Sequence, residues 1–185
     1  MFVLCCNNTI SSQSITSQVF SWEDAVIANP DSVRFIDCSH MRWDSVPEKI
    51  LSFRNLQFLD LSFNKLTSLP PEIRRLDSLE VVKLNKNKFS SFPLQLCGLA
   101  DLKVLEINRN KIELIPDCLT YLDQLVRLDL WDNPIKTIPD SIKNLKNLKV
   151  LDLSGIAFSK TFQEKIRRLL PNTQIVLENP CNCLD

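Results

Sequence analysis

The feature that most constrains this chain is a 23-residue period that runs through most of its 185 residues. Equivalent segments begin at Val33, Leu56, Leu79, Leu102, Leu125 and Leu148. Proline recurs at the same interval, at Pro47, Pro70, Pro93, Pro116 and Pro139. A fixed period of this length is typical of a solenoid, in which each short structural unit stacks on the next. The chain is therefore expected to be elongated and built from stacked, equivalent turns.

The apolar pattern inside one period predicts the structure of each turn. The second repeat reads LQFLDLSFNKLTSLPPEIRRLDS, and its seven expected core positions are Leu56, Leu59, Leu61, Leu66, Leu69, Ile73 and Leu76. All equivalent positions of the first five repeats are apolar, if Cys38 and Trp43 are counted as apolar. Alternation in LDL predicts a strand with Leu59 and Leu61 inward and Asp60 outward. After Pro70, the spacing of Ile73 and Leu76 predicts a return as a short helical or 3₁₀ turn.

The pattern LxxLxLxxNxLxxLPxxIxxL resembles the leucine-rich repeat family, in its short 23-residue form with the LP dipeptide. The likeness covers residues 33–158 and extends to bacterial secreted or surface proteins of this family. It implies an α/β solenoid, a horseshoe with a parallel concave sheet, short helical or 3₁₀ convex segments and helical caps at both ends. It also implies that the domain recognises another protein.

The ends of the solenoid need caps, because an isolated repeat cannot bury enough apolar surface to offset the ordering of its backbone. We expect an N-terminal tail, signal or tether remnant over 1–20 and a repeat domain over 21–185. Within that domain we expect an N-cap helix over 21–32, repeats over 33–158 and a C-terminal cap over 159–185. Ser21 is the expected N-cap of the first helix, and Thr161 to Glu164 reads as a capping box for the last one.

An asparagine recurs where each strand must bend into the turn. Its amide can satisfy turn backbone groups that no sheet ladder reaches. We therefore predict a structural ladder of four side chains, Asn64, Asn87, Asn110 and Asn133. Met41 and Ile156 take the equivalent positions in the first and last repeats, as expected of atypical terminal units.

Side chains that leave the sheet on its concave face are the candidates for partner binding. This surface combines basic groups in the middle repeats, acidic groups toward both ends, and large apolar groups, a composition typical of interface anchors. The candidate residues are Phe58, Asp60, Phe63, Lys83, Lys86, Glu106, Arg109, Arg127, Asp129, Trp131 and Asp132. The alternative is that the aromatic side chains cover the sheet within the molecule.

Composition weakens most other classes of function. The formal charge is zero, with 22 basic and 22 acidic residues, so there is no cationic field for nucleic acid. Gly98 and Gly155 are the only glycines, which excludes a glycine-rich phosphate loop, and His40 is the only histidine. The aspartates of the strands read as a solvated ladder rather than a glycosidase pair. We therefore expect no catalytic residues, no metal site and no cofactor.

The seven cysteines bear on the cellular compartment. Val3-Leu4-Cys5 resembles the end of a bacterial lipoprotein signal, which makes Cys5 a candidate lipid anchor followed by a polar tether; the alternative is an ordinary tail. Apolar runs are far shorter than the roughly 20 residues of a transmembrane helix, so none is expected. The sequence leaves open whether Cys97, Cys118, Cys181 and Cys183 form disulfides.

The function predicted from these patterns is non-enzymatic recognition of a protein ligand on the concave sheet, with an extracellular or cell-surface location favoured. The alternative is a cytoplasmic scaffold or regulator of a signalling enzyme. The identity of the partner does not follow from the sequence, because a fold does not fix a function.

Overall fold

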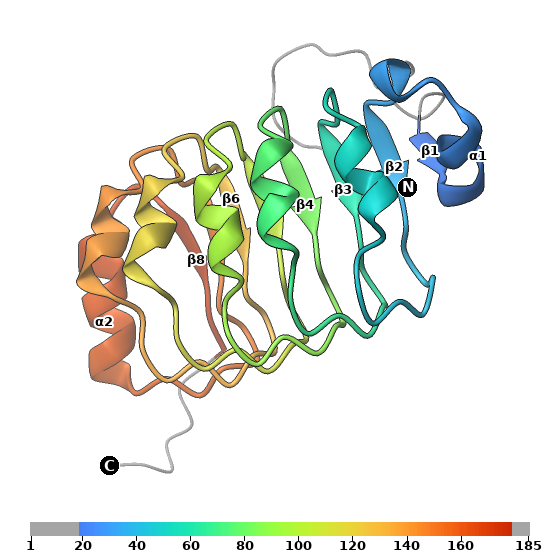
Figure 1. Ribbon diagram of the computed structural model, residues 1–185. Helices are drawn as coiled ribbons and strands as arrows, with labels where there is room; N and C mark the ends of the chain where they lie inside the picture. Colours follow the sequence, from blue (N-terminus) through green and yellow to red (C-terminus); the bar gives the residue numbers. More distant parts are fainter. Residues whose placement is uncertain (1–18, 179–185) are drawn as a thin grey trace.

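A computed structural model describes residues 19–178, which form one parallel sheet of eight strands in chain order (Figure 1). The strands are β1 (Val19–Ser21), β2 (Phe35–Asp37), β3 (Phe58–Asp60), β4 (Val81–Lys83), β5 (Val104–Glu106), β6 (Arg127–Asp129), β7 (Val150–Asp152) and β8 (Gln174–Val176). The strand register follows the repeat, since Leu59 pairs with Val82 and Val82 with Leu105, each 23 residues further along the chain. The predicted leucine-rich repeat horseshoe with a parallel sheet is confirmed.

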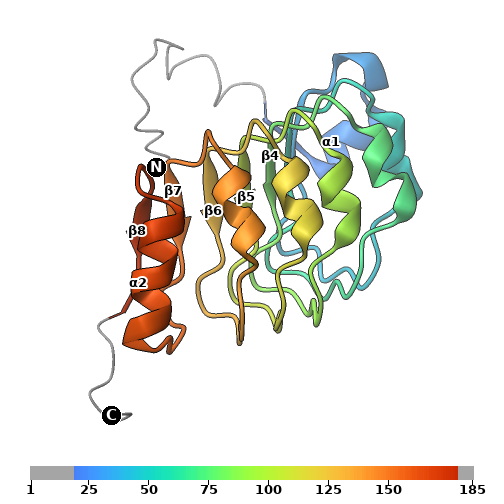
Figure 2. The same ribbon diagram turned by 90° about the vertical axis from the view of Figure 1, so that its left-hand side faces the viewer.

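The convex layer consists of short 3₁₀ turns, one for each of the first five repeats, stacked opposite the sheet (Figure 2). They are η2 (Glu48–Ser52), η3 (Pro71–Arg75), η4 (Leu94–Gly98), η5 (Asp117–Tyr121) and η6 (Asp140–Asn144). Each turn follows its repeat proline, which stands at the N-cap with extended backbone. Proline favours this extended geometry because its ring fixes φ near −65°.

The core is the set of periodic apolar positions. Every one of those positions in the first five repeats is buried except Trp43 and Val46, which are half-buried in the first repeat. Phe53 and Phe89 are the largest side chains that are completely buried. Stacked repeats thus share one continuous core.

At the N-terminal end, β1 pairs with β2 and extends the sheet by a strand that the sequence pattern did not reveal. Helix α1 (Trp22–Ile27) follows, and the Ser21 side chain accepts a hydrogen bond from the Asp24 backbone N–H, as expected of an N-cap. A 3₁₀ turn, η1 (Pro30–Ser32), leads into the first repeat. The indole of Trp22 packs edge-on against Trp43, with ring centroids 5.0 Å apart.

At the C-terminal end, helix α2 (Lys160–Leu169) stands beside the 3₁₀ turns, and β8 pairs with β7 (Figure 2). The predicted capping box from Thr161 to Glu164 is wrong. The helix begins one residue before Thr161, and the hydroxyl of Ser159 accepts the hydrogen bond from the Phe162 backbone N–H.

Candidate partner-binding surface

Outward positions of the strands carry aspartates whose main contacts are local. In four repeats, a carboxylate oxygen accepts a hydrogen bond from the backbone N–H two residues later, at 2.8–3.0 Å. These aspartates are Asp37, Asp60, Asp129 and Asp152. Such a bond closes the strand end, because that N–H has turned out of the sheet ladder. The acidic row is therefore partly structural.

The two middle repeats replace this closure with a network between strands. The Lys83 ammonium lies 3.5 Å from a carboxylate oxygen of Glu106, and the Asn85 amide donates to the same oxygen at 3.1 Å. The Asn108 amide donates to Asp129 at 2.8 Å. The middle of the sheet thus presents a fixed set of paired polar groups.

Burial divides the predicted residues. Phe63, Arg109 and Asp132 are exposed, whereas Lys83 and Asp129 are buried at 9% and 7% residue exposure. The remaining candidates are half-buried: Phe58, Asp60, Lys86, Glu106, Arg127 and Trp131. The expectation that Lys83 and Asp129 face solvent is wrong, because the network described above and the neighbouring side chains enclose them.

Burial also governs the ionisation of the strand carboxylates. It raises the pKa of Asp60 above its ordinary value; the hydrogen bond from the Ser62 backbone N–H opposes the rise, and the nearby Asp37 charge adds to it. Burial likewise raises the pKa of Asp129, against hydrogen bonds from Asn108 and Trp131. In the core, burial raises the pKa of the Cys38 thiol, which fits a small buried apolar side chain.

The eighth residue of every repeat has left-handed backbone, with φ between 52° and 73°. We call this set the left-handed row; it consists of His40, Phe63, Lys86, Arg109, Asp132 and Gly155. Only glycine adopts such a φ without a steric penalty. Sequence reasoning placed Phe63, Lys86, Arg109 and Asp132 on the concave face and missed the conformation of the row. The one available signal was their fixed place just before the ladder asparagine or its replacement.

Side chains of the left-handed row contact one another along the sheet. The His40 and Phe63 rings stack with centroids 4.2 Å apart, and the Lys86 ammonium lies 4.3 Å from the Phe63 centroid. Further along, Arg109 pairs with Asp132 at 3.4 Å. These contacts join side chains of neighbouring repeats in two groups, His40–Phe63–Lys86 and Arg109–Asp132.

Trp131 joins this row from the preceding position of its repeat. The Arg109 guanidinium lies 4.5 Å from the centroid of its indole ring. A Cβ at Gly155 would lie 3.1 Å from the Trp131 ring, so glycine leaves the space that the indole occupies. The Trp131 side chain is thus held in place by both neighbouring repeats.

Directly after the left-handed row stand the four ladder asparagines, all buried. The Asn87 amide donates to the carbonyls of Leu61 and Leu84, and its side-chain oxygen accepts from the Leu66 N–H at 3.0 Å. Asn64 also donates to the Leu61 carbonyl, and Asn110 to that of Leu84. Neighbouring asparagines therefore share acceptors, which links adjacent turns.

On the convex side, Cys97 of η4 and Cys118 of η5 form a disulfide with a Cα–Cα distance of 5.7 Å. The two residues stand at different positions of successive repeats, 21 residues apart, so their periodic spacing alone did not predict the pairing. Cys5, Cys181 and Cys183 lie outside the described residues.

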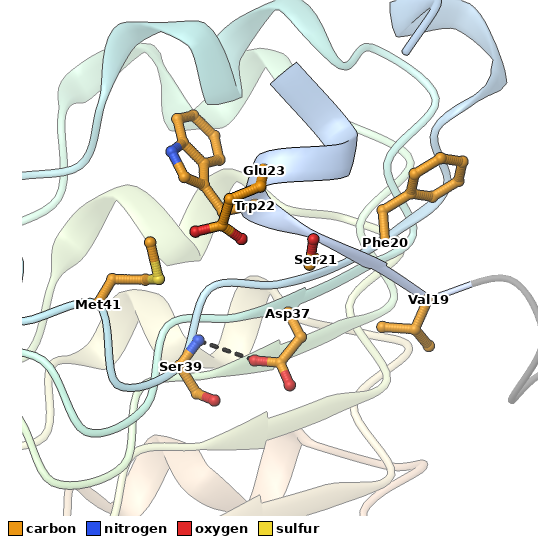
Figure 3. Close-up of a pocket in the computed structure, with 8 residues that line it drawn as sticks. All are labelled: Val19, Phe20, Ser21, Trp22, Glu23, Asp37, Ser39 and Met41. Carbon is orange, nitrogen blue, oxygen red and sulfur yellow. Dashed lines mark hydrogen bonds between the residues drawn. The ribbon is translucent and has the colours of Figure 1, made fainter. Parts of the chain in front are cut away.

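A pocket of about 370 Å³ lies at the N-terminal end of the sheet (Figure 3). Its lining includes Phe20, Trp22, Glu23, Asp37 and Met41. None of the predicted partner-binding residues lines it. The candidate surface is therefore the open face of the sheet rather than this pocket.

Comparison with known proteins identifies the repeat. The model of the family described as "Leucine rich repeat" matches residues 54–112, and that described as "Leucine Rich repeats (2 copies)" matches residues 123–164. The chain belongs to the leucine-rich repeat family.

Solved leucine-rich repeat structures support the same fold. A leucine-rich repeat protein of Leptospira interrogans is 29% identical, with a TM-score of 0.64 over 78% of this chain and 43% of that one. An internalin of Listeria monocytogenes is 20% identical, with a TM-score of 0.59 over 79% of this chain and 42% of its own. The listerial internalin C2 is 25% identical, with a TM-score of 0.57 over 64% of this chain and 50% of its own. This leucine-rich repeat chain thus spans half or less of each of these structures.

A search of curated protein sequences found no significant match. Within residues 19–178, no helix of this leucine-rich repeat domain is long and apolar enough to cross a membrane. The same residues contain no group of three or more histidine, cysteine, aspartate or glutamate side chains that could hold a metal ion. Membership of the family supports a protein-interaction module.

Proposed function

We propose that this chain is a non-enzymatic recognition module that binds a protein partner on its concave sheet, at the cell surface or outside the cell. The observation that carries the proposal is a contrast within each repeat. Core positions are apolar throughout the first five repeats and the ladder position is asparagine in four successive repeats, whereas the residue of the left-handed row differs in every repeat. A rigid scaffold with a variable face is suited to specific recognition.

Preorganisation strengthens this proposal. Ring stacking, cation–π contacts and ion pairs hold the side chains of Phe63, Arg109 and Trp131 in place before any partner arrives. A surface that is already ordered loses less conformational entropy on binding, which favours affinity. Aromatic and arginine side chains are also the residues most often found at binding hot spots.

The test of the face is a matched pair of double variants. R127E/W131A changes the concave sheet, and R75E/N144A makes the same change of charge and a truncation at exposed convex positions. Captured proteins are identified by mass spectrometry, and folding is checked by circular dichroism. The proposal expects a protein captured by the native chain to be lost with R127E/W131A and kept with R75E/N144A. Loss with the convex variant alone would overturn the concave assignment.

The location outside the cytoplasm is supported by the Cys97–Cys118 bridge, because structural disulfides persist mainly in oxidising compartments. Mass spectrometry of native material should recover the linked Cys97 and Cys118 peptides, together with oxidised Cys181 and Cys183. A lipoprotein would also carry an acylated Cys5. Free thiols at all four positions and an unmodified Met1 would instead support the alternative, a cytoplasmic scaffold or regulator of a signalling enzyme.

A further inference from the structure

The backbone conformation of the left-handed row is unfavourable for most of the residues in the row. Five of its six members are not glycine, and Phe63 is a bulky aromatic with a φ of 57°. A left-handed conformation is unfavourable for a residue with a Cβ, because the Cβ crowds the following carbonyl oxygen. Stability alone would favour glycine at each of these positions, as found at Gly155. Strained residues retained at the surface point to a role for their side chains.

The contacts within the row leave the Phe63 ring and the Arg109 side chain partly exposed, and the Lys86 ammonium has no ion-pair partner among the described residues. Phe63 is 41% exposed although His40 and Lys86 lie against its ring, and the Arg109 side chain is 40% exposed. Among the described residues, Lys86 forms no ion pair, whereas Arg109 pairs with Asp132, which is itself largely exposed. The centre of the row therefore offers an apolar group beside a positive charge that is not neutralised.

The spacing of the two cations suits a carboxylate-bearing ligand. Lys86 and Arg109 occupy equivalent positions in neighbouring repeats, and their backbones follow paired strands, which lie about 4.8 Å apart. Side chains at this spacing can contact one carboxylate together, or two carboxylates of one extended segment. The adjacent ring of Phe63 can contact an apolar side chain of the same segment.

We propose that the left-handed row binds a short acidic peptide segment, with its carboxylates on Lys86 and Arg109 and an apolar side chain against Phe63. This inference rests on the proposed function, because it assigns the chemistry of the partner to one part of the concave face.

The surroundings of the row favour a short acidic segment over a long polyanion. Asp37, Asp60 and Asp152 lie on the strands to either side, and Asp132 stands in the row itself. A nucleic acid or a sulfated polysaccharide would extend its charge over these carboxylates and be repelled. A peptide with a few carboxylates and an apolar residue matches both the basic centre and its acidic flanks.

The experiment selects peptides from a random 12-residue display library on the native chain and measures the enriched peptides in solution by fluorescence anisotropy. The test variant is K86E/R109E. The matched control is K88E/K111E, which makes the same charge change in the same two repeats, at exposed positions outside the row. Circular dichroism checks that both variants fold, and the conservative change K86R tests whether a cation is sufficient.

We expect enriched peptides that contain two or more acidic residues and an apolar residue. K86E/R109E should weaken their binding at least about 30-fold, K88E/K111E less than about threefold, and K86R little. Replacing Glu by Gln and Asp by Asn in the peptide should have an effect similar to that of K86E/R109E. Raising the salt concentration should weaken binding, because screening reduces attraction between exposed charges.

Two outcomes overturn this inference and differ in what they say of the proposed function. In the first, the enriched peptides lack acidic residues, and their binding is lost with R127E/W131A but not with K86E/R109E. This result would support recognition on the concave face but contradict an acidic peptide as the ligand. No enrichment, or binding that survives both concave variants, would remove the left-handed row as a peptide site. In that case the capture experiment with whole proteins decides the proposed function independently.

Discussion

Two adjacent positions of the repeat differ in how strictly the structure restricts the residue type. The ladder asparagine is buried in four successive repeats, whereas the residue before it is phenylalanine, lysine, arginine or aspartate in those same repeats. Both positions lie at the same bend of the chain. A side chain that must satisfy buried backbone groups is restricted to one residue type, whereas a position constrained only in φ accepts many types at some cost in stability.

This contrast separates what stabilises the solenoid from what distinguishes one turn from the next. The asparagine ladder contributes hydrogen bonds that any partner leaves untouched. The left-handed row contributes little to the core, and its side chains meet solvent. Variants at the two positions should therefore affect different measurements.

The largest expected effect is at the ladder. Asn87→Leu removes the acceptor for the buried Leu66 N–H, while Leu61 and Leu84 keep a second donor from the neighbouring asparagines. The buried Leu66 N–H would be left without an acceptor, and the side chain would change shape. Together these effects should lower the free energy of unfolding by about 2–3 kcal/mol. Urea midpoints measure this loss. Asn144→Ala, at an exposed convex site, should change little; an equal loss there would remove the special role of the ladder.

Gly155→Ala should have the next largest effect. Alanine at this position would have to keep the left-handed φ of 73°, and its Cβ would lie 3.1 Å from the Trp131 ring. Both backbone strain and crowding therefore disfavour the substitution. We expect a loss of about 1–2 kcal/mol. Gly98→Ala is the control, because its Cβ would meet the flexible Arg74 side chain and its φ is not left-handed. Thermal midpoints that fall equally for both variants would contradict this account.

Lys86→Gly should move stability in the opposite direction. Glycine relieves the left-handed strain, and this gain outweighs the opposing effect of the greater entropy of the unfolded chain. We therefore expect the free energy of unfolding to rise by up to about 1 kcal/mol. Lys88→Gly, outside the left-handed row, should destabilise by about 0.5–1 kcal/mol. Opposite shifts of the urea midpoint would support strain in the row, and shifts of the same sign would argue against it.

The smallest effect concerns pH at Asp129. Burial raises its folded pKa above the unfolded value, so the folded state binds the proton more tightly. Its contribution to stability is therefore fully present below the unfolded pKa and is lost as pH rises through the folded pKa. Asp129→Asn removes this dependence. The difference in unfolding free energy between the variant and the native chain should therefore change with pH between the unfolded and the folded pKa of Asp129. Parallel curves of unfolding free energy against pH would contradict it.

Periodicity was sufficient to predict the fold. The spacing of leucines and prolines specified the strands, the 3₁₀ turns and the core, because one 23-residue unit recurs with the same hydrophobic requirement. The ends were harder to predict, because β1 and the Ser159 cap belong to no repeat and depend on local contacts. The burial of Lys83 and Asp129 was missed because a strand alternation shows which face a side chain leaves but not how closely its neighbours enclose it.

The Cys97–Cys118 bridge also determines how this solenoid would respond to a pulling force. Repeats that contact only their neighbours can peel away from either end one at a time. The bridge links η4 of the third repeat to η5 of the fourth. The segment between the two cysteines, which are 21 residues apart, therefore cannot extend while the disulfide is intact. At about 3.3–3.6 Å for each residue, that is roughly 70 Å of contour length. An oxidised chain would therefore release its central turns as one mechanical unit, and a reduced chain would release them singly.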